Sequence, residues 1–215
     1  MTALLRLGAA RGLSGRTLLS LAASVSIVTL TAMVAVGIRT SAGAVAAGAT
    51  IDSAVLVGLI APAAVLSQLL QDRAAWLLET ATRKARRVRL LWFVSLCTLA
   101  TLSCLACVLL TAANVDTFLL AADFTLFFAI SCAGALVLGG PLGWTPAAAL
   151  ALAASTPGLI PFEWNYVAQA SYAIHIWCVA GALLVVTGAA FVALDEHGID
   201  RQRRMLERQP GVTDD

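Results

Sequence analysis

The lysine and arginine residues fall almost entirely into three clusters, and this distribution most constrains how the chain can fold. Of fourteen basic residues, three precede residue 17, six lie within 73–89 and four lie within 201–208. The sequence between these clusters is apolar in long runs, and the chain as a whole is 60% hydrophobic and only 12% charged. A soluble domain needs more charge to cover its surface. The pattern predicts an all-α, polytopic membrane protein whose basic clusters face the cytoplasm.

Long uncharged runs predict six transmembrane helices, because about 20 helical residues cross a hydrocarbon core of about 30 Å. The first run is longer than the apolar part of a secretory signal, so we interpret it as a retained helix. One membrane domain is expected at 17–194, between an interfacial segment at 1–16 and a cytoplasmic tail at 195–215. The predicted spans are at about 17–38, 52–71, 90–112, 117–138, 144–160 and 174–194.

The fifth run differs from the others because Pro157 and Pro161 interrupt it. The helix-compatible part is too short for an undisturbed crossing. The sequence from Thr156 to Ala173 mixes prolines, polar residues and aromatics, and we expect a partly re-entrant or interfacial element on the outer face. Before this run, Gly139-Gly140-Pro141 predicts a tight turn on the inner face.

The stretch from Asp72 to Trp92 combines apolar residues at steps of three and four with charges of both signs. This spacing predicts a cytoplasmic amphipathic helix at 72–89, between the second and third spans. Glu79 precedes Arg83 by four residues, the spacing of an intrahelical ion pair. Such a helix often only meets anionic lipid. Its mixed charge and its position between two spans also favour docking of a soluble partner.

Three acidic or histidine side chains are candidates for handling a substrate or a proton. Asp123 lies within the fourth predicted span, where a carboxylate is costly and usually faces a cavity or a partner. It lies about two turns from the predicted outer end, so a structural role or contact with interfacial water is an open alternative. Glu163 and His175 could approach each other on the outer side, although a solvated carboxylate and an interfacial histidine are the simpler interpretation.

Catalytic and metal-binding patterns are not found in the sequence. There is no G-x-S-x-G, H-E-x-x-H or P-loop motif, and the two histidines lie on opposite predicted sides. Cys104 and Cys107 form a C-x-x-C without a second pair or a nearby histidine, so we interpret them as small buried residues. The basic clusters lack interleaved stacking aromatics, which argues against nucleic-acid binding. We expect no enzyme activity, no metal and no cofactor on this chain itself.

The layout resembles the permease subunits of type-2 ATP-binding-cassette exporters. These subunits have six spans, an interfacial N-terminal helix, a coupling helix between spans two and three, and a partly re-entrant outer segment between spans five and six. The corresponding pieces here are 1–16, 72–89 and 156–173. The coupling region of the family often has an acidic-Arg pair, a Leu-Glu pair and a basic run, and this chain has Asp72-Arg73, Leu78-Glu79 and Arg83 to Arg87 in that order. Ala74-Ala75-Trp76 replaces the usual glycine after the acidic-Arg pair.

The resemblance implies a transport subunit in a bacterial inner membrane, with both termini cytoplasmic. ATP and magnesium would be bound by a separate P-loop ATPase, and two permeases, identical or different, would form the translocation pathway. Asp123 would be a candidate pathway residue. The residues implied to contact the ATPase are Asp72, Arg73, Glu79, Arg83, Lys84 and Arg86.

Two other classes of function remain open from the residues alone. The basic helix could recruit a partner to a non-transporting membrane interaction protein, such as an assembly or immunity factor. An intramembrane enzyme is the weakest interpretation, because no catalytic constellation is present in the sequence.

Overall fold

The computed structural model describes residues 15–41, 53–70, 82–111, 116–156, 159–161 and 164–193. Within these ranges the chain forms six α-helices and no β-strand. The α-helices are α2 (Gly15–Ser41), α3 (Ser53–Gln68), α5 (Thr82–Thr111), α6 (Thr117–Leu138), α7 (Thr145–Ser155) and α8 (Ala173–Ala193). Three short 3₁₀ turns complete the described part: η1 (Gly140–Leu142), η3 (Tyr166–Ala168) and η4 (Ala170–Tyr172). The all-helical fold class is therefore confirmed.

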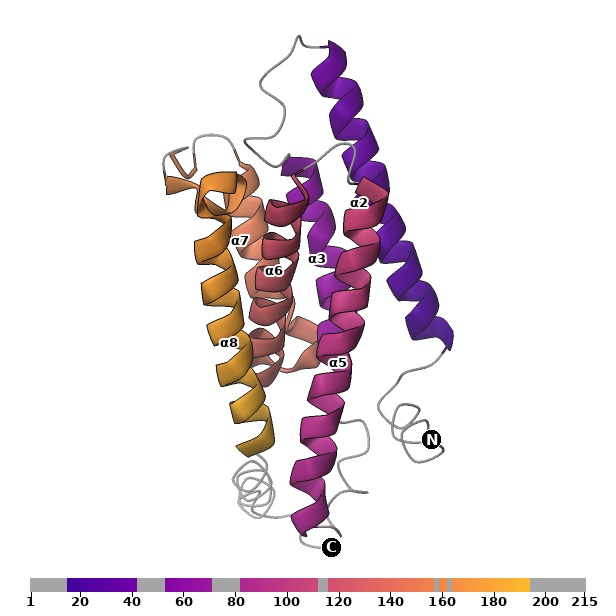
Figure 1. The fold of residues 1–215 in the computed structure, drawn as a ribbon, viewed down its shortest axis with the longest axis vertical. Coiled ribbons are helices and arrows are strands. Elements are labelled where there is room, and N and C mark those ends of the chain that lie inside the picture. Colours follow the sequence, from indigo (N-terminus) through magenta and orange to yellow (C-terminus); the bar gives the residue numbers. More distant parts are fainter. Residues whose placement is uncertain are drawn as a thin grey trace, which may run out of the picture.

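Helix α6 is the centre of the bundle (Figure 1). It packs against α8, α3, α5 and α7, while α2 lies at the edge against α3 and α5. Its side chains form much of the core, with Phe124, Phe127 and Phe128 at 2% exposure or less. The helix is apolar on all sides, as expected for a helix surrounded by other helices.

Four of the described helices are long and apolar enough to cross a membrane. The candidate spans are Gly15–Met33, Arg89–Thr111, Thr117–Leu138 and Ala170–Ala193. Few residues of the last span are buried inside the bundle, as expected for a helix with a large lipid-facing surface. The prediction of a membrane-embedded helical protein is thus supported. The span at 117–138 has the bounds that the sequence predicted.

Six spans are not confirmed, because the helices at the second and fifth predicted spans are short. Helix α3 has 16 residues and α7 has 11, against the 20 expected at 52–71 and the 17 expected at 144–160. At 1.5 Å per residue, α7 is only about 16 Å long. It ends at Ser155, before Pro157, which disfavours helical geometry in the residue that precedes it.

Helix α5 begins earlier than the predicted third span at 90–112. It runs without interruption from Thr82 to Thr111, so the basic residues after Thr82 belong to the same helix as the apolar span. The predicted third span at 90–112 agrees with the candidate span Arg89–Thr111, and the described part of the amphipathic stretch before it continues into the span as one helix. The physical reason is that no glycine or proline interrupts 82–111. The first part of that stretch, 71–81, lies outside the described residues.

The two ends of α6 are fixed by local chemistry. Asp116 caps its start, since one carboxylate oxygen accepts hydrogen bonds from the backbone N–H groups of Phe118 and Leu119, both at 2.9 Å. At its end, Gly139 has a φ of 85°, which a residue with a side chain rarely adopts. The predicted turn at Gly139 is confirmed, and η1 reverses the chain into α7.

Small residues let neighbouring helices approach closely at some positions of the bundle but not at others. Gly188 on α8 lies against the Phe93 ring, where an added Cβ would come within 2.7 Å of a ring carbon. Gly181, one heptad earlier, has no atom of a described residue within 4 Å of the corresponding position. Of these two glycines, only Gly188 therefore packs closely against another of the described helices.

Candidate functional site

The residues implied to contact an ATPase fall mostly outside the described part of the chain. Asp72, Arg73 and Glu79 lie outside it. Arg83, Lys84 and Arg86 belong to the first turns of α5, and their side chains also lie outside the described part. The expected ion pair between Glu79 and Arg83 consequently stays a prediction.

A hydrogen bond joins α3 and α5, the two helices that flank the segment at 71–81, at the ends of the helices next to that segment. The indole N–H of Trp92 on α5 donates a hydrogen bond of 3.0 Å to the backbone oxygen of Leu69, just after α3. Trp92 is 6% exposed and Leu69 is 4% exposed, so the bond is shielded from solvent. Leu69 continues from α3 in a turn in which its N–H donates to Leu66. The end of α3 and the beginning of α5 therefore form one packed joint.

Replacing Trp92 with phenylalanine is expected to lower the free energy of unfolding by about 1 kcal/mol, because the buried Leu69 carbonyl loses its donor. Trp144→Phe is the matched control. Its indole N–H also donates to a backbone oxygen, that of Pro141 at 2.9 Å, but Trp144 is 37% exposed and water can replace the bond. Denaturant unfolding in detergent micelles measures both variants. Equal losses would contradict a structural role of the joint.

Asp123 is fully buried in the middle of the bundle, at 0% exposure. Neither carboxylate oxygen has a hydrogen-bond partner among the described residues. Its burial differs from the expectation that it could reach interfacial water. An unpartnered buried carboxyl group is costly, and an ionisable residue inside a span is by default a functional candidate. Packing alone therefore does not explain the presence of Asp123 in this core.

A second buried polar side chain fixes the segment between α7 and α8. Asn165 is 9% exposed, and its side-chain amide donates a 2.7 Å hydrogen bond to the backbone oxygen of Ala154, near the end of α7. The η3 turn follows directly, and η4 then leads into α8. This bond holds the described part of the predicted re-entrant element against the bundle. Whether that element is re-entrant in a membrane stays a prediction.

Two tyrosines and a histidine gather at the beginning of α8. The rings of Tyr166 and Tyr172 meet edge to face, with centroids 4.5 Å apart, and the His175 ring lies 6.0 Å from that of Tyr172. Among the described residues, none forms a hydrogen bond with either tyrosine hydroxyl or with the His175 side chain. The expected partner of His175, Glu163, lies outside the described residues, so their approach stays a prediction.

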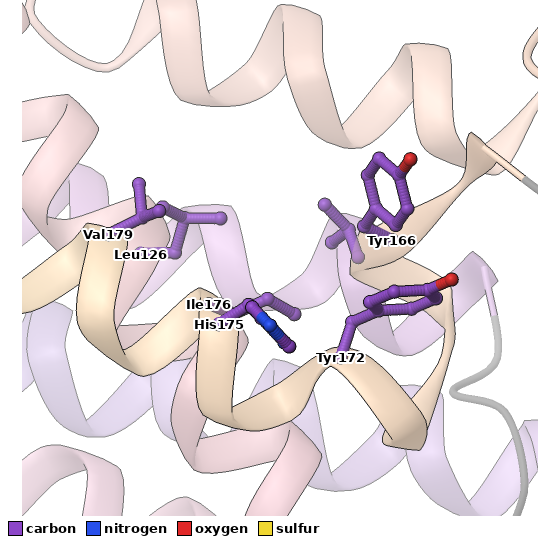
Figure 2. Close-up of a pocket in the computed structure, with 7 residues that line it drawn as sticks. Leu126, Tyr166, Tyr172, His175, Ile176 and Val179 are labelled. Carbon is purple, nitrogen blue, oxygen red and sulfur yellow. The ribbon is translucent and has the colours of Figure 1, made fainter.

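These aromatic residues line a cavity of about 430 Å³ between α6, α8 and η3, here called the aromatic cavity (Figure 2). Its floor is buried, with Leu126 at 7% and Ile176 at 5% exposure, and its rim is exposed. Figure 2 shows Leu126 and Val179 at one end and the two tyrosines at the other. The lining residues are Leu126, Tyr166, Val167, Tyr172, His175, Ile176 and Val179.

A smaller cavity of about 230 Å³ lies between α5, α6 and α8. Its lining includes Cys97, Cys104, Thr125 and Trp177, and the Trp177 indole nitrogen is buried without a described partner. All five cysteines are free thiols, and three of them are buried. No group of three or more metal-ligating side chains occurs among the described residues. The arrangement offers polar atoms to a small guest but no catalytic set within that part of the chain.

Asp123, His175 and the tyrosine and tryptophan residues of these sites were noted from the sequence, but the aliphatic residues that share the cavities with them were not, and neither was their grouping. The aromatic residues of the stretch at 156–173 were expected on the outer face, where interfacial aromatics commonly lie. Nothing in their spacing indicated that two of them would share a cavity with Leu126, which lies forty residues earlier. The Trp92–Leu69 hydrogen bond could not be predicted from the sequence either, because it joins α5 to the end of another helix.

Comparisons with protein families, curated proteins and solved structures find no match for this chain.

Proposed function

We propose that this chain is the membrane-spanning permease subunit of an ATP-driven exporter, coupled to a separate P-loop ATPase through the segment between α3 and α5. Two permeases, identical or different, would form the pathway for a hydrophobic or peptide-like cargo. The observation that carries the proposal is the continuity of α5, which joins the basic residues after Thr82 to the centre of the bundle.

A continuous helix can transmit movement along its length. The 30 residues of α5 extend about 45 Å, roughly 15 Å more than the hydrocarbon core is thick. Its basic first turns would therefore stand in the aqueous phase while the rest packs against α2, α6 and α8. Because Trp92 ties α5 to the end of α3, a partner that displaces the segment between them would move both helices together.

The placement of basic residues supports one orientation of the bundle across the membrane. Helices α2 and α5, whose first turns carry Arg16 and the basic residues after Thr82, both begin at their lower ends in Figure 1, with the start of α2 well above that of α5. Under the positive-inside rule, the lower end of the bundle would be cytoplasmic. The aromatic cavity, at the opposite end, would then face outward. The proposed location is a bacterial inner membrane.

Asp123 is the proposed pathway residue, and its burial sets a condition on that role. A side chain that is fully enclosed by α6 and its neighbours can meet a cargo only after those helices separate. Its exposure would then alternate with the transport cycle, as in rigid-body transitions that open and close an interface. The unpartnered carboxylate would be tolerated in the closed state because the open state uses it.

Purification of the tagged chain from its native host in mild detergent tests the proposal. We expect a stoichiometric P-loop ATPase among the co-eluting proteins identified by mass spectrometry. The ATPase should be lost from a variant that carries both Glu79→Arg and Arg83→Glu, which keeps the net charge of the segment and hence its insertion. Arg83→Lys is the control and should retain it.

Two outcomes would contradict the proposal. If the chain elutes with a stoichiometric partner that is not an ATPase, the interaction-protein interpretation replaces the permease. If an ATPase co-elutes equally with the charge-swapped variant, docking does not use the segment between α3 and α5.

A further inference from the structure

We propose that the aromatic cavity binds one long-chain amphiphile, with its aliphatic chain along Leu126, Ile176 and Val179 and a compact hydrogen-bonding head at Tyr166, Tyr172 and His175. The site is independent of the ATPase coupling proposed above, because it lies at the opposite end of the bundle from the beginning of α5.

The size and lining of the cavity fit such a guest. Its volume of about 430 Å³ lies within the range of roughly 300–1,000 Å³ typical of small-molecule sites. The lining is divided, with aliphatic side chains at one end and tyrosine rings at the other (Figure 2). A ligand that is apolar throughout would leave the polar end unused, and a fully polar one would not fit the aliphatic end.

The head group is constrained by the donors that the cavity offers. The two tyrosine hydroxyls and an imidazole N–H can all donate, and none forms a hydrogen bond with a described residue. No lysine, arginine, aspartate or glutamate lines the cavity among the described residues. A multiply charged phosphate head would therefore lack a cationic partner. A carboxyl or carbonyl head, which accepts two or three hydrogen bonds, matches better.

The route into the cavity runs along the exposed face of α8. Val179 is 58% exposed and forms part of the rim, while Ile176, three residues earlier, is buried in the floor. The aliphatic chain of a ligand that lies in the membrane beside α8 could therefore enter the cavity from the side without crossing the bundle. Tyr166, at 50% exposure, would contact the head group of the ligand at the membrane–water interface, where amphipathic aromatic rings prefer to lie.

Photolabelling of the full chain in phosphatidylcholine nanodiscs tests the site. The probe is a 16-carbon fatty acid with a diazirine in its chain, and mass spectrometry locates the labelled residues. We expect saturable labelling of α6 and α8 at the cavity, displaced by unlabelled fatty acid but not by hexadecane, which lacks a head.

Two tryptophan substitutions on α8 provide a matched pair. Val179→Trp should fill the cavity and reduce saturable labelling at least about tenfold, the effect of about 1.4 kcal/mol in affinity. Val185→Trp makes the same change on a more exposed residue, at 72%, that does not line the cavity, and should leave labelling unchanged. Both positions are on the surface of the bundle, so neither variant should impair folding.

The head contacts are tested by the double variant Tyr166→Phe and Tyr172→Phe, which keeps both rings. Loss of the hydroxyls should weaken fatty-acid competition about two- to tenfold for each hydrogen bond removed.

A second probe, phosphatidylcholine with the diazirine in one acyl chain, distinguishes a free fatty acid from a membrane phospholipid as the ligand. Strong, saturable labelling only by the free fatty acid supports a single-chain ligand. Equal labelling by both probes, or labelling unaffected by Val179→Trp, would overturn the proposal in favour of ordinary bilayer contact.

Discussion

Replacing Gly134 with alanine is expected to destabilise the bundle by about 1–3 kcal/mol, as overpacking of a tight interior does. Gly134 lies on α6 where the chain returns before α7, and a Cβ there would press on the backbone carbonyl of Gly143, within 3.1 Å of its carbon. Backbone cannot move aside as a flexible side chain can. Chemical denaturation in detergent micelles, followed by helical circular dichroism, measures the loss.

Gly181→Ala is the control for this prediction, because it makes the same change in the interior of another helix. Gly181 on α8 has no atom within 4 Å of the added carbon in the part of the chain that the structure describes. Alanine is favoured over glycine in a helix by about 1 kcal/mol, so this variant should be neutral or more stable. If both variants change stability in the same direction and to the same extent, the close approach of Gly134 and Gly143 does not hold the α6–α7 turn together.

Replacing Asp123 with valine is expected to raise the free energy of unfolding by about 1–3 kcal/mol. The substitution removes a buried carboxyl group that has no hydrogen-bond partner among the described residues and extends the apolar core around it. The proposed pathway role predicts that the same variant, although more stable, loses transport. Gains in stability with loss of function are the usual mark of a residue that activity requires.

Asp116→Val makes the same substitution at the start of the same helix and should have the opposite effect. Asp116 accepts two backbone hydrogen bonds as the cap of α6, and losing them should cost about 0.5–2 kcal/mol. Unfolding midpoints of the two variants in one detergent decide the comparison. A loss of stability at Asp123 similar to that at Asp116 would mean that Asp123 has a partner in the folded protein.

The parts of the fold that follow from local sequence could be predicted. The bounds of α6 follow from a long, largely apolar run, with Asp123 as its one charged residue, between Asp116, a capping residue, and Gly139, a helix-ending residue. The early end of α7 follows in the same way from Pro157, which was recognised as a break. In these cases the deciding physics lies within a few residues along the chain.

The parts that depend on packing between helices could not be predicted. The continuity of α5 from Thr82 into the span at 90–112 was not predicted, because the change from charged to apolar composition indicates where a span begins but not whether the helix continues. The complete burial of Asp123 depends on which face of α6 meets its neighbours, and an all-apolar helix gives no periodic signal for that. The aromatic cavity likewise joins residues from separate elements.

Photo-crosslinking from the two ends of α5 tests the proposed coupling most directly. A crosslinking amino acid placed at position 83 lies in the first turn of the helix, and one at position 109 replaces Leu109, which is 69% exposed near the other end. After illumination of intact cells, the proposal predicts a covalent product between position 83 and a P-loop ATPase, and no such product from position 109. A product with a different protein at position 83, or an ATPase product of equal yield at both positions, would contradict it.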